Sequence, residues 1–321
     1  MIDGMLELWT IWHDLLFEWV VQPIAFGLGF GQLLEVAYEG TGLFMVGVLE
    51  VLIMLVLIAP MQRWRPVEPI TDRQAIRIDA IYTLVHKLGV FELFMYFTFA
   101  NWLEKAIAYL RGWGMPTFHI DQLWPGVTDV AFVSFLIYLV VFDFVNYLIH
   151  RGQHEFEWWW KLHALHHSQR QMTMWTDNRN HLIDSIVVAT IIASVAVLVG
   201  VGPGQFVALM ALGRLSENLQ HANVRLSFGP VFERVWVSPR FHRRHHSIGV
   251  GHESFDHGRV VLGGCNFGVL LPVWDMLFRT ADFQLRFDPT GVRDQVEQGR
   301  DYGRGFWAQQ KQGVLRLLGR A

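Results

Sequence analysis

Four apolar runs of membrane-spanning length dominate the first half of the sequence. They cover residues 15–37, 42–60, 80–103 and 127–149, and a bilayer core of about 30 Å needs roughly 20 helical residues. With 52% hydrophobic and only 17% charged residues, the chain is too apolar for an ordinary soluble globule of its size. We therefore predict an all-α integral membrane protein with about four transmembrane helices.

Two glycine-containing segments within apolar sequence need separate interpretation. Residues 186–215 are interrupted by a Gly/Pro cluster at 200–204, which predicts two short helices forming a re-entrant hairpin or a shallow pair. Gly27-Leu-Gly29-Phe-Gly31 lies inside an apolar run with no preceding strand, so helix packing is favoured over a nucleotide-binding loop. The N-terminus lacks the positive region of a signal peptide, and we expect the first apolar run to stay in the mature protein.

Charge and cysteine content exclude several classes of protein. A formal net charge of -3 and the lack of a basic tail give no attraction to nucleic acid. The single cysteine, Cys265, excludes an internal disulfide and a cysteine-ligated iron–sulfur cluster, because each needs at least two thiols.

Histidines are concentrated in the second half of the chain. Twelve of the 15 lie between His150 and His257, and eight of these form three compact boxes. The boxes contain His150 and His154; His163, His166 and His167; and His242, His245 and His246. Neutral imidazole is a common ligand for zinc, copper, iron and nickel, so the boxes predict a metal centre with nitrogen ligands.

Helical spacing indicates how the boxes are arranged. Asp143, Tyr147, His150 and His154 share one helical face, and Asp143 either supports a ligating imidazole or bonds neighbouring helices, the former being favoured. Arg151 stands where a zinc protease of the His-Glu-x-x-His type has its general base, which excludes that class. In the other two boxes, the adjacent histidines are turned by about 100° from each other. Each doublet therefore gives one imidazole to each of two metal ions.

Basic residues predict the orientation in the membrane. They follow the second and fourth apolar runs and recur near the third box: Arg63, Arg65, Arg73 and Arg77; Arg151, Lys161, Arg170 and Arg179; Arg240, Arg243, Arg244 and Arg259. By the positive-inside rule these segments are cytoplasmic. We expect the N-terminus, the histidine boxes and the C-terminus to lie on the cytoplasmic side of a bacterial inner membrane.

Three classes of function fit a histidine-rich membrane protein. A zinc or copper transporter would place its ligands along a path near the middle of the bilayer. A non-catalytic protein would use the boxes to bind lipid headgroups, haem or metal. Here the second and third boxes lie in a charged, tryptophan-rich segment at 158–167 and in a Ser-Pro-Arg-Phe segment at 238–246, which favours an enzyme at the membrane interface.

The motifs resemble those of the fatty acid hydroxylase/sterol desaturase superfamily of integral-membrane di-iron oxygenases. The resemblance rests on HxxxH, HxxHH and HxxHH in order, on Ser238-Pro-Arg-Phe-His242, on Asn266-Phe-Gly268 and on Trp274-Asp-Met-Leu-Phe-Arg-Thr280. It covers about residues 130–280. It implies a four-helix membrane stem capped by a cytosolic, histidine-rich helical domain. The chain then divides into membrane helices and loops at 1–126, a catalytic region at 127–281 and a C-terminal tail at 282–321.

The resemblance also implies further site residues. Glu217 and His221 have the i, i+4 spacing of the family's polar pair; His221 is expected to be a ligand, and Glu217 a carboxylate ligand or a water-bridged acceptor. His181 precedes Leu182 where relatives carry proline, and it lines the pocket or orients a ligand. The predicted metal ligands are His150, His154, His163, His166, His167, His221, His242, His245 and His246. A last polar cluster is expected to form a surface lid or a headgroup contact: His252, Glu253, Asp256 and His257.

Such a centre would use two irons and dioxygen to hydroxylate or desaturate a C–H bond. Because no flavin, nicotinamide or haem motif is visible, an external ferredoxin, cytochrome or reductase is implied. The substrate is expected to be a lipid entering from the bilayer, past headgroup-level tryptophans at 158–160 and 175. Fatty acyl, sterol, carotenoid, ether-lipid and amino-acid-lipid substrates stay open, with a membrane lipid favoured over a sterol. The oligomeric state is left open.

Overall fold

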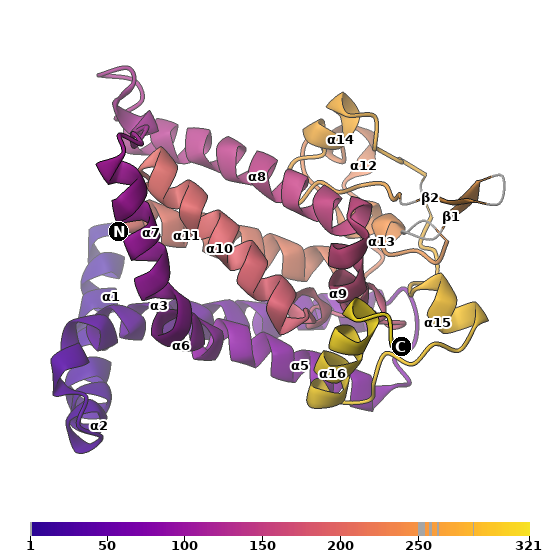
Figure 1. Ribbon diagram of the computed structural model, residues 1–321, viewed down its shortest axis with the longest axis horizontal. Coiled ribbons are helices and arrows are strands. Elements are labelled where there is room, and N and C mark those ends of the chain that lie inside the picture. Colours follow the sequence, from indigo (N-terminus) through magenta and orange to yellow (C-terminus); the bar gives the residue numbers. More distant parts are fainter. Residues whose placement is uncertain (1, 250–253, 257–258, 262, 285) are drawn as a thin grey trace.

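The computed structural model describes residues 2–249, 254–256, 259–261, 263–284 and 286–321, and the regular secondary structure in this part of the chain is almost entirely helical (Figure 1). The α-helices are α1 (Ile2–Leu16), α2 (Gln22–Gly27), α3 (Leu34–Ile53), α4 (Ala59–Trp64), α5 (Arg73–Lys87), α6 (Val90–Met95), α7 (Asn101–Gly112), α8 (Ala131–Glu155), α9 (Glu157–His167), α10 (Leu182–Val199), α11 (Pro203–Gln220), α12 (Gly229–Phe232), α13 (Pro239–His245), α14 (Val273–Leu277), α15 (Arg293–Glu297) and α16 (Phe306–Leu317). Strands β1 (Ser254–Asp256) and β2 (Arg259–Val261) form one antiparallel hairpin.

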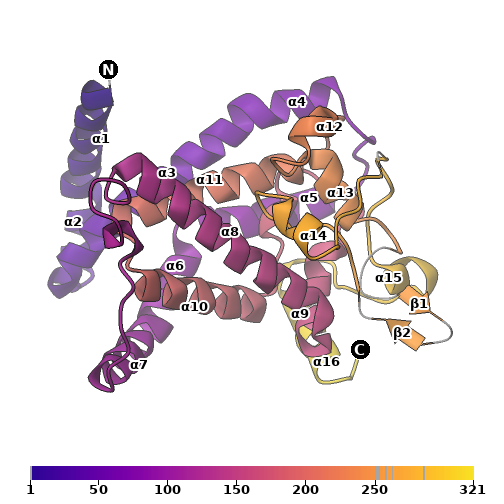
Figure 2. The same ribbon diagram turned by 90° about the horizontal axis from the view of Figure 1, so that it is seen from above.

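The molecule consists of a bundle of long helices with a cap at one end. Helices α3, α5, α8, α10 and α11 run along the length of the bundle, and α9, α13, α15 and α16 gather at the end remote from the N-terminus (Figures 1 and 2). Helices α8, α10 and α11 share a hydrophobic core that includes Tyr138, Phe142, Ile192 and Leu209.

Three segments are long and apolar enough to cross a membrane, and a bent pair of helices makes a fourth. The segments are Gly31–Trp64, Ala131–Glu155 and Leu182–Val199, and the pair is Arg73–Lys87 with Val90–Phe99, bent by 55°. These spans agree with the predicted all-α membrane fold of about four transmembrane helices. Two details of the prediction were wrong. Residues 15–37 form no single span, and the first helix of the pair at 186–215 is not short, since Leu182–Val199 is long enough to cross. The predicted break at 200–204 is confirmed, because α10 ends at Val199 and α11 begins at Pro203.

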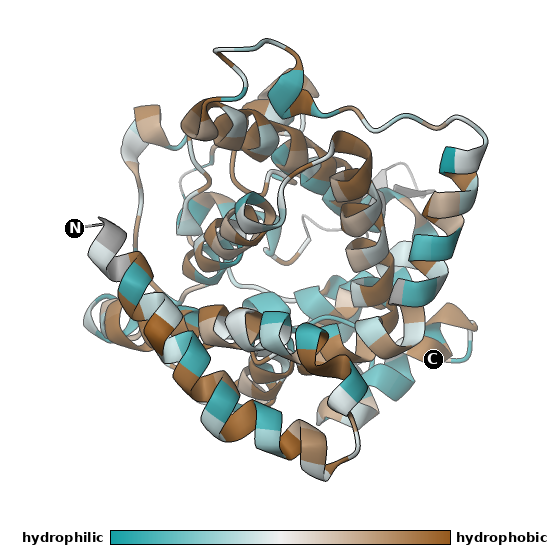
Figure 3. Ribbon diagram, turned by 90° about the vertical axis from the view of Figure 1, so that its left-hand side faces the viewer, coloured by the Kyte–Doolittle hydropathy of each residue, from teal (hydrophilic) through white to brown (hydrophobic). Residues whose placement is uncertain are grey.

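The N-terminal helices lie across the end of the bundle that is remote from the cap. Helix α2 ends at Gly27, Gly29 turns the chain with a φ of 77°, and the first long span begins at Gly31. Seen from that end, α1 alternates apolar and polar residues, whereas the bundle helices are mostly apolar (Figure 3). The N-terminus and the histidine-rich cap therefore lie at opposite ends of the bundle. The cytoplasmic location of both stays a prediction.

A buried ion pair network joins three bundle helices where the bent span breaks. The Glu50 carboxylate accepts from Lys87 Nζ at 2.5 Å and from Arg214 Nη2 at 2.8 Å. Glu50 and Lys87 are almost fully buried, and charges in a membrane are tolerated when they are paired. A Cβ on Gly47 would lie 1.6 Å from the Lys87 carbonyl oxygen, so only glycine permits this close approach of α3 to α5.

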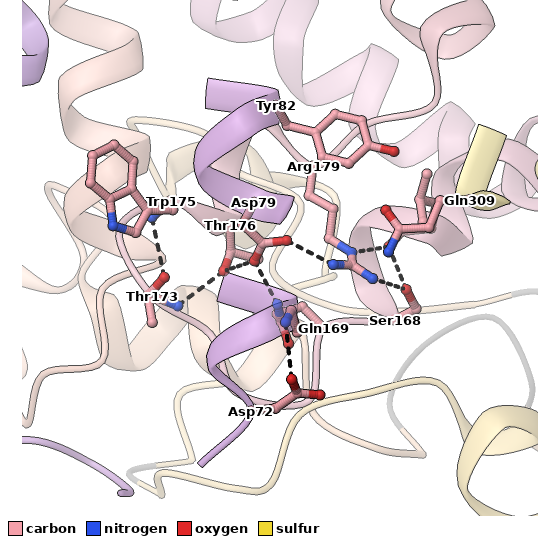
Figure 4. Close-up of polar contacts among 12 residues, drawn as sticks. Asp72, Asp79, Tyr82, Ser168, Gln169, Thr173, Trp175, Thr176, Arg179 and Gln309 are labelled. Carbon is pink, nitrogen blue, oxygen red and sulfur yellow. Dashed lines mark hydrogen bonds and ion pairs between the residues drawn. The ribbon is translucent and has the colours of Figure 1, made fainter. Parts of the chain in front are cut away.

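A second buried network fixes the loop that follows α9 (Figure 4). Asp79 on α5 accepts from Gln169 Nε2 at 2.5 Å, Thr176 Oγ1 at 3.1 Å and Arg179 Nη1 at 2.7 Å. Arg179 Nε also donates to the carbonyl oxygen of Leu165 on α9 at 3.2 Å. Because unpaired buried charges are costly, this network ties the end of α9, which carries the second histidine box, to a membrane-spanning helix.

The C-terminal segment packs against the cap instead of forming a peripheral tail. Helix α16 packs against α9 and α5, and Gln310, Gly313 and Arg316 on it are buried. Arg316 Nε donates to the carbonyl oxygen of Lys161 at 3.1 Å. The division of the chain at residue 281 stays a prediction, but residues beyond it are part of the packing around the second box.

Candidate metal centre

Four elements bring nine buried histidines together inside the cap. They are the end of α8, helix α9, the residue after α11, and α13 with the residue that follows it. The histidines are His150, His154, His163, His166, His167, His221, His242, His245 and His246, none more than 7% exposed. Ser238 caps the N-terminus of α13, since its Oγ accepts from Phe241 N at 3.1 Å. Pro239, the first residue of the helix, lacks the N–H group that would be unpaired at this position.

Eight of these imidazoles form two groups of four whose nitrogen donors converge. Group one consists of His150, His154, His167 and His245, and group two of His166, His221, His242 and His246. Within each group the donor atoms lie within 4.8 Å of one another. Both doublets are divided between the groups, as predicted from the turn between adjacent helical residues. His163 belongs to neither group, although its ring lies 5.2 Å from those of His154 and His166.

The contacts inside group two fit a bound cation better than hydrogen bonds. His221 Nε2 lies 3.1 Å from His166 Nε2 and 3.0 Å from His242 Nε2, and His242 Nε2 lies 3.1 Å from His246 Nε2. His221 Nδ1 donates to the Glu217 carbonyl oxygen at 2.8 Å, so a neutral His221 has a single lone pair at Nε2. One lone pair cannot accept from two partners. Nitrogens bound to one ion at about 2.0–2.1 Å and at right angles lie about 3 Å apart.

Backbone carbonyls fix two imidazoles of group one. His150 Nδ1 donates to the Phe267 carbonyl oxygen at 2.9 Å, and His245 Nδ1 to that of Cys265 at 2.7 Å. In the neutral form each Nε2 is then left with a lone pair. The Nε2 atom of His245 is buried and has no hydrogen-bond partner among the described residues. Such imidazoles are oriented for a metal, since ligating histidines characteristically donate their other nitrogen to a carbonyl or carboxylate.

The segment that supplies these carbonyls is itself held in place. Asn266, with a φ of 60°, donates through Nδ2 to the carbonyl oxygens of Phe241 at 3.0 Å and Asp282 at 2.9 Å. Asp275 accepts from the backbone N–H groups of Phe267 at 2.9 Å and Gly268 at 2.7 Å. These residues belong to the Asn-Phe-Gly and Trp-Asp motifs of the sequence, and the structure shows that they position group one.

Asp184 supports His163 and was missed by the sequence analysis. Its carboxylate accepts from His163 Nδ1 at 3.2 Å, Gln153 Nε2 at 2.8 Å and Trp159 Nε1 at 2.7 Å. His163 Nε2 is buried and without a hydrogen-bond partner among the described residues. The available signal was an aspartate at the start of an apolar helix, where a charge needs a partner.

Burial favours the neutral form of most imidazoles in the cap. It lowers the pKa of His245 to about 3 and that of His221 to about 4. It also lowers the pKa values of His166, His167, His242 and His246 well below their usual range, and the neighbouring histidines add to this effect. Metal ions bind neutral imidazole, so the protein holds these side chains in the form that a metal requires.

Asp143 does not support an imidazole, and that favoured interpretation was wrong. Its carboxylate accepts from the backbone N–H groups of Leu270 at 2.8 Å and Leu271 at 3.1 Å, and from Trp274 Nε1 at 2.8 Å. It therefore joins α8 to the segment that carries Phe267, which corresponds to the alternative role of bonding neighbouring elements.

His181 lies outside the candidate metal centre, so its predicted place in the pocket was wrong. Its Nδ1 accepts from Ile183 N at 3.2 Å, which caps α10, and its Nε2 donates to the Gln310 carbonyl oxygen at 2.9 Å. Both ring nitrogens are thus occupied. A Cβ on Gly313 would lie 2.2 Å from His181 Cδ2, so the imidazole is packed directly against α16.

The remaining predicted residues have mixed outcomes. Glu217 is one helical turn before His221 but its carboxylate is not among the donors of group two. Trp159 and Trp160 are buried in the cap, whereas Trp158 is exposed. Their position at headgroup depth stays a prediction. His252, Glu253 and His257 lie outside the described residues, and Asp256 is described only as part of β1.

Comparison with known proteins identifies relatives of the catalytic region. Residues 135–280 match the model of the fatty acid hydroxylase family. An ornithine lipid hydroxylase of Rhizobium tropici is 31% identical over 181 residues, which cover 56% of this chain and 51% of that protein. An alkylglycerol monooxygenase of Caenorhabditis elegans is 26% identical over 147 residues, 46% of this chain and 26% of that protein.

A fatty acid hydroxylase of a Lecanicillium species is 24% identical over 166 residues, 49% of this chain and 44% of that protein. The matched stretch thus spans about half or less of each relative's length. No solved structure gives a significant match to the chain.

Proposed function

We propose that this integral membrane protein, whose residues 135–280 match the model of the fatty acid hydroxylase family, is a di-iron oxygenase that hydroxylates a lipid. The observation that carries the proposal is the pair of four-histidine groups in the cap. Neutral imidazole nitrogens whose lone pairs accept no hydrogen bond are suitable ligands for iron. A site for two irons also explains why the adjacent histidines of each doublet belong to different groups. The names of the relatives support hydroxylation over desaturation.

Two irons held by groups one and two would supply reductive activation of dioxygen and removal of hydrogen from a C–H bond. The protein's own residues bind and orient the irons and exclude water. The carbonyls of Cys265 and Phe267 fix two imidazoles, and Asp184 fixes His163 as a further ligand. We assign Glu217 the role of a carboxylate that reaches group two directly or through water.

The proposed substrate is a membrane lipid that reaches the centre from the bilayer. His150 and His154 lie at the end of the candidate span Ala131–Glu155, which supports entry of a lipid chain beside α8. Ornithine lipids are the first substrates to test, because the relative in Rhizobium tropici is named for them. Four basic residues around the connection between α4 and α5 support a cytoplasmic cap in a bacterium: Arg63, Arg65, Arg73 and Arg77.

A metal transporter is disfavoured by where the histidines lie. Transported ions need ligands near the middle of the bilayer, whereas group one is built from the end of α8 together with α9 and α13. The charged side chains in the middle of the bundle, Glu50 and Lys87, are paired with each other and form no set of metal donors.

The test combines metal content with product analysis. We expect about two irons per chain in protein purified from iron-replete cells. With ferredoxin, reductant and ¹⁸O₂, ornithine lipids should gain one oxygen atom that comes from dioxygen. Protein with two irons that forms no oxygenated lipid would contradict the proposed activity. Protein that binds no metal after iron reconstitution would contradict the di-iron centre itself.

A further inference from the structure

The proposed oxygenase function, on which this inference rests, requires electrons from outside the chain. Hydroxylation of a C–H bond consumes one O₂, two electrons and two protons, and yields the alcohol and one water. The reductant is a one-electron carrier protein, oxidised twice in each turnover. The cap must therefore contain a surface for the carrier and a route from that surface to the histidine groups.

Trp160 connects group one with the outer part of the cap. Its ring centroid lies 5.0 Å from that of His154 and 5.3 Å from that of His167. The side chain is 6% exposed, and it lies on α9, the helix that carries the second box. Electron tunnelling slows steeply with every gap between atoms, so an aromatic ring packed against two candidate ligands offers a favourable route.

Tyr302 extends this route toward the surface. It belongs to the same buried cluster as Trp160, together with Ala164 and Val292. Its hydroxyl donates to Asp294 Oδ1 at 3.0 Å, so the ring is held in one orientation. Arg300 and Arg304 are exposed, and they lie two residues before and two residues after Tyr302 in the sequence. The buried aromatic cluster thus lies directly beneath a basic part of the cap.

The surface around Tyr302 differs in charge from the rest of the protein. Residues 293–321 contain six Lys or Arg and three Asp or Glu, a formal charge of +3, although the whole chain carries -3. Arg304 and Lys311 are exposed, as are the acidic residues Glu297 and Asp301. A basic surface attracts an acidic partner. The interspersed acids favour a folded protein with a matching charge pattern over a uniformly anionic lipid layer.

We propose that residues 293–321 form the docking surface for an acidic one-electron carrier protein, and that Tyr302 and Trp160 lie on the electron path from this carrier to group one. The C-terminal segment is then the electron-entry side of the enzyme. Its packing against α9 brings the docked carrier close to the second histidine box.

The docking surface is tested by binding, without reference to activity. The metal-free protein in phosphatidylcholine nanodiscs is titrated with a plant-type [2Fe–2S] ferredoxin, an acidic one-electron carrier. The double variant Arg304→Glu and Lys311→Glu should weaken binding at least about tenfold at low salt, and the difference should shrink at high salt. Both residues are exposed, so the change leaves the fold intact.

A matched control separates local docking from net charge. The double variant Arg63→Glu and Arg65→Glu makes the same charge change at exposed positions beside α4, on the opposite side of the cap from α16 in Figure 2. It should leave ferredoxin affinity unchanged. Equal weakening by both variants, or by neither, overturns the docking surface. The measurement is repeated in nanodiscs of anionic lipid. If the Arg304→Glu and Lys311→Glu variant leaves ferredoxin affinity unchanged and alters only the contact of α16 with anionic lipid, the surface binds lipid, and the proposed docking surface is overturned.

The electron path is tested in the iron-loaded protein. Trp160→Leu should slow reduction of the metal at saturating ferredoxin at least about tenfold, while Trp160→Phe keeps an aromatic ring and most of the rate. Iron content and ferredoxin affinity should stay unchanged, because a merely structural role would lower one of them. Equal rates in the wild type and both variants overturn the path. A wild type that ferredoxin reduces, but that oxygenates no lipid, contradicts the proposed function instead.

Discussion

Group one and group two contain the same number of imidazoles, yet the surrounding protein fixes them differently. In group one, His150 and His245 donate to backbone carbonyls, and neighbouring His163 donates to Asp184. In group two, only His221 has its Nδ1 atom bonded to the backbone, at Glu217. The Nδ1 atoms of the other three are buried without a hydrogen-bond partner among the described residues: His166, His242 and His246.

This difference indicates how much of each site exists before a metal binds. Hydrogen bonds to the remote nitrogen fix both the ring orientation and the tautomer of a ligand. Two of the four imidazoles of group one, His150 and His245, are therefore oriented by the backbone, against one in group two, His221. Group two is arranged chiefly by the mutual approach of its Nε2 atoms, so its geometry depends more on the ion. We expect the metal in group two to exchange faster and the metal in group one to respond more to changes in the surrounding residues.

The largest effect should come from removing a ligand. His242→Ala should empty group two and His245→Ala group one, each lowering activity by more than about 100-fold, because loss of a ligand exceeds the 10–100-fold cost of losing a supporting residue. Elemental analysis should show about one iron per chain in each variant. Two irons retained in either variant would show that the replaced histidine is not a ligand.

The next effect concerns the metal-free protein at low pH. Burial lowers the pKa values of His221 to about 4 and His245 to about 3, whereas both are near 6.5 in the unfolded chain. The unfolded state binds more protons below pH 6.5, so stability is full above 6.5 and falls as the pH decreases toward these values. Each of these two histidines should lower the free energy of unfolding by about 1.4 kcal/mol for every pH unit below 6.5, until the pH reaches its pKa in the folded protein.

Denaturant unfolding in detergent at pH 7, 6 and 5 measures this loss. Metal should suppress unfolding over the same range by holding the imidazoles neutral, and it should do so until protons displace it. A metal-free protein equally stable at pH 7 and 5 would mean that the histidines are solvated and not enclosed as the structure places them.

A smaller effect, chiefly on group one, is expected from Asp184→Asn. The ring of His163, which Asp184 holds, lies 5.1–5.4 Å from three imidazoles of group one and beside His166 of group two. The neutral amide supports His163 less strongly than the carboxylate, so the affinity of group one should fall by about 10–100-fold and that of group two much less.

When a chelator removes the metals from the two-metal protein, each group should release its metal in a separate phase. The variant should change chiefly the phase that belongs to group one. Asp294→Asn alters a buried carboxylate that contacts Tyr302 and Arg300 but no histidine, and should change neither phase. Equally weakened metal binding by both groups in Asp184→Asn would contradict the conclusion that the two groups bind their metals independently.

Local sequence patterns predicted the two histidine groups, but not the hydrogen bonds that hold the surrounding segments in place. The spacing of His166 with His167 and of His245 with His246 determines that the doublets diverge, because the angle between adjacent residues is a property of the helix alone. The partners of Asp143 lie 127 to 131 residues further along the chain. Two of them are backbone N–H groups, which leave no pattern of side chains to detect.

The errors about His181 and the N-terminus have a related cause. His181 has the residue type and local neighbours of a site residue, but its position is decided by α16, more than 120 residues later. The apolar run at 15–37 has the composition of a span, yet the turn at Gly29 divides it between two helices of different direction. Composition predicts that a segment is buried or in lipid, whereas tertiary packing decides where it ends.

The smallest expected effect comes from Asn266, which lies between the two carbonyls that orient group one. Asn266→Ala removes its hydrogen bonds to Phe241 and Asp282 and strains a residue with a φ of 60°. Asn266→Gly removes the same bonds without the strain. Both variants should lower the free energy of unfolding by about 1–3 kcal/mol, because buried hydrogen-bond partners of Asn266 are left unpaired. The alanine variant should lose about 1 kcal/mol more, because its backbone is strained at this positive φ. Group-one affinity should fall only a few-fold, because the bonds from Asp275 to the same segment remain. Thermal unfolding and chelator competition measure the two effects, and an equal loss from group two would mean that this segment supports the whole cap rather than one metal.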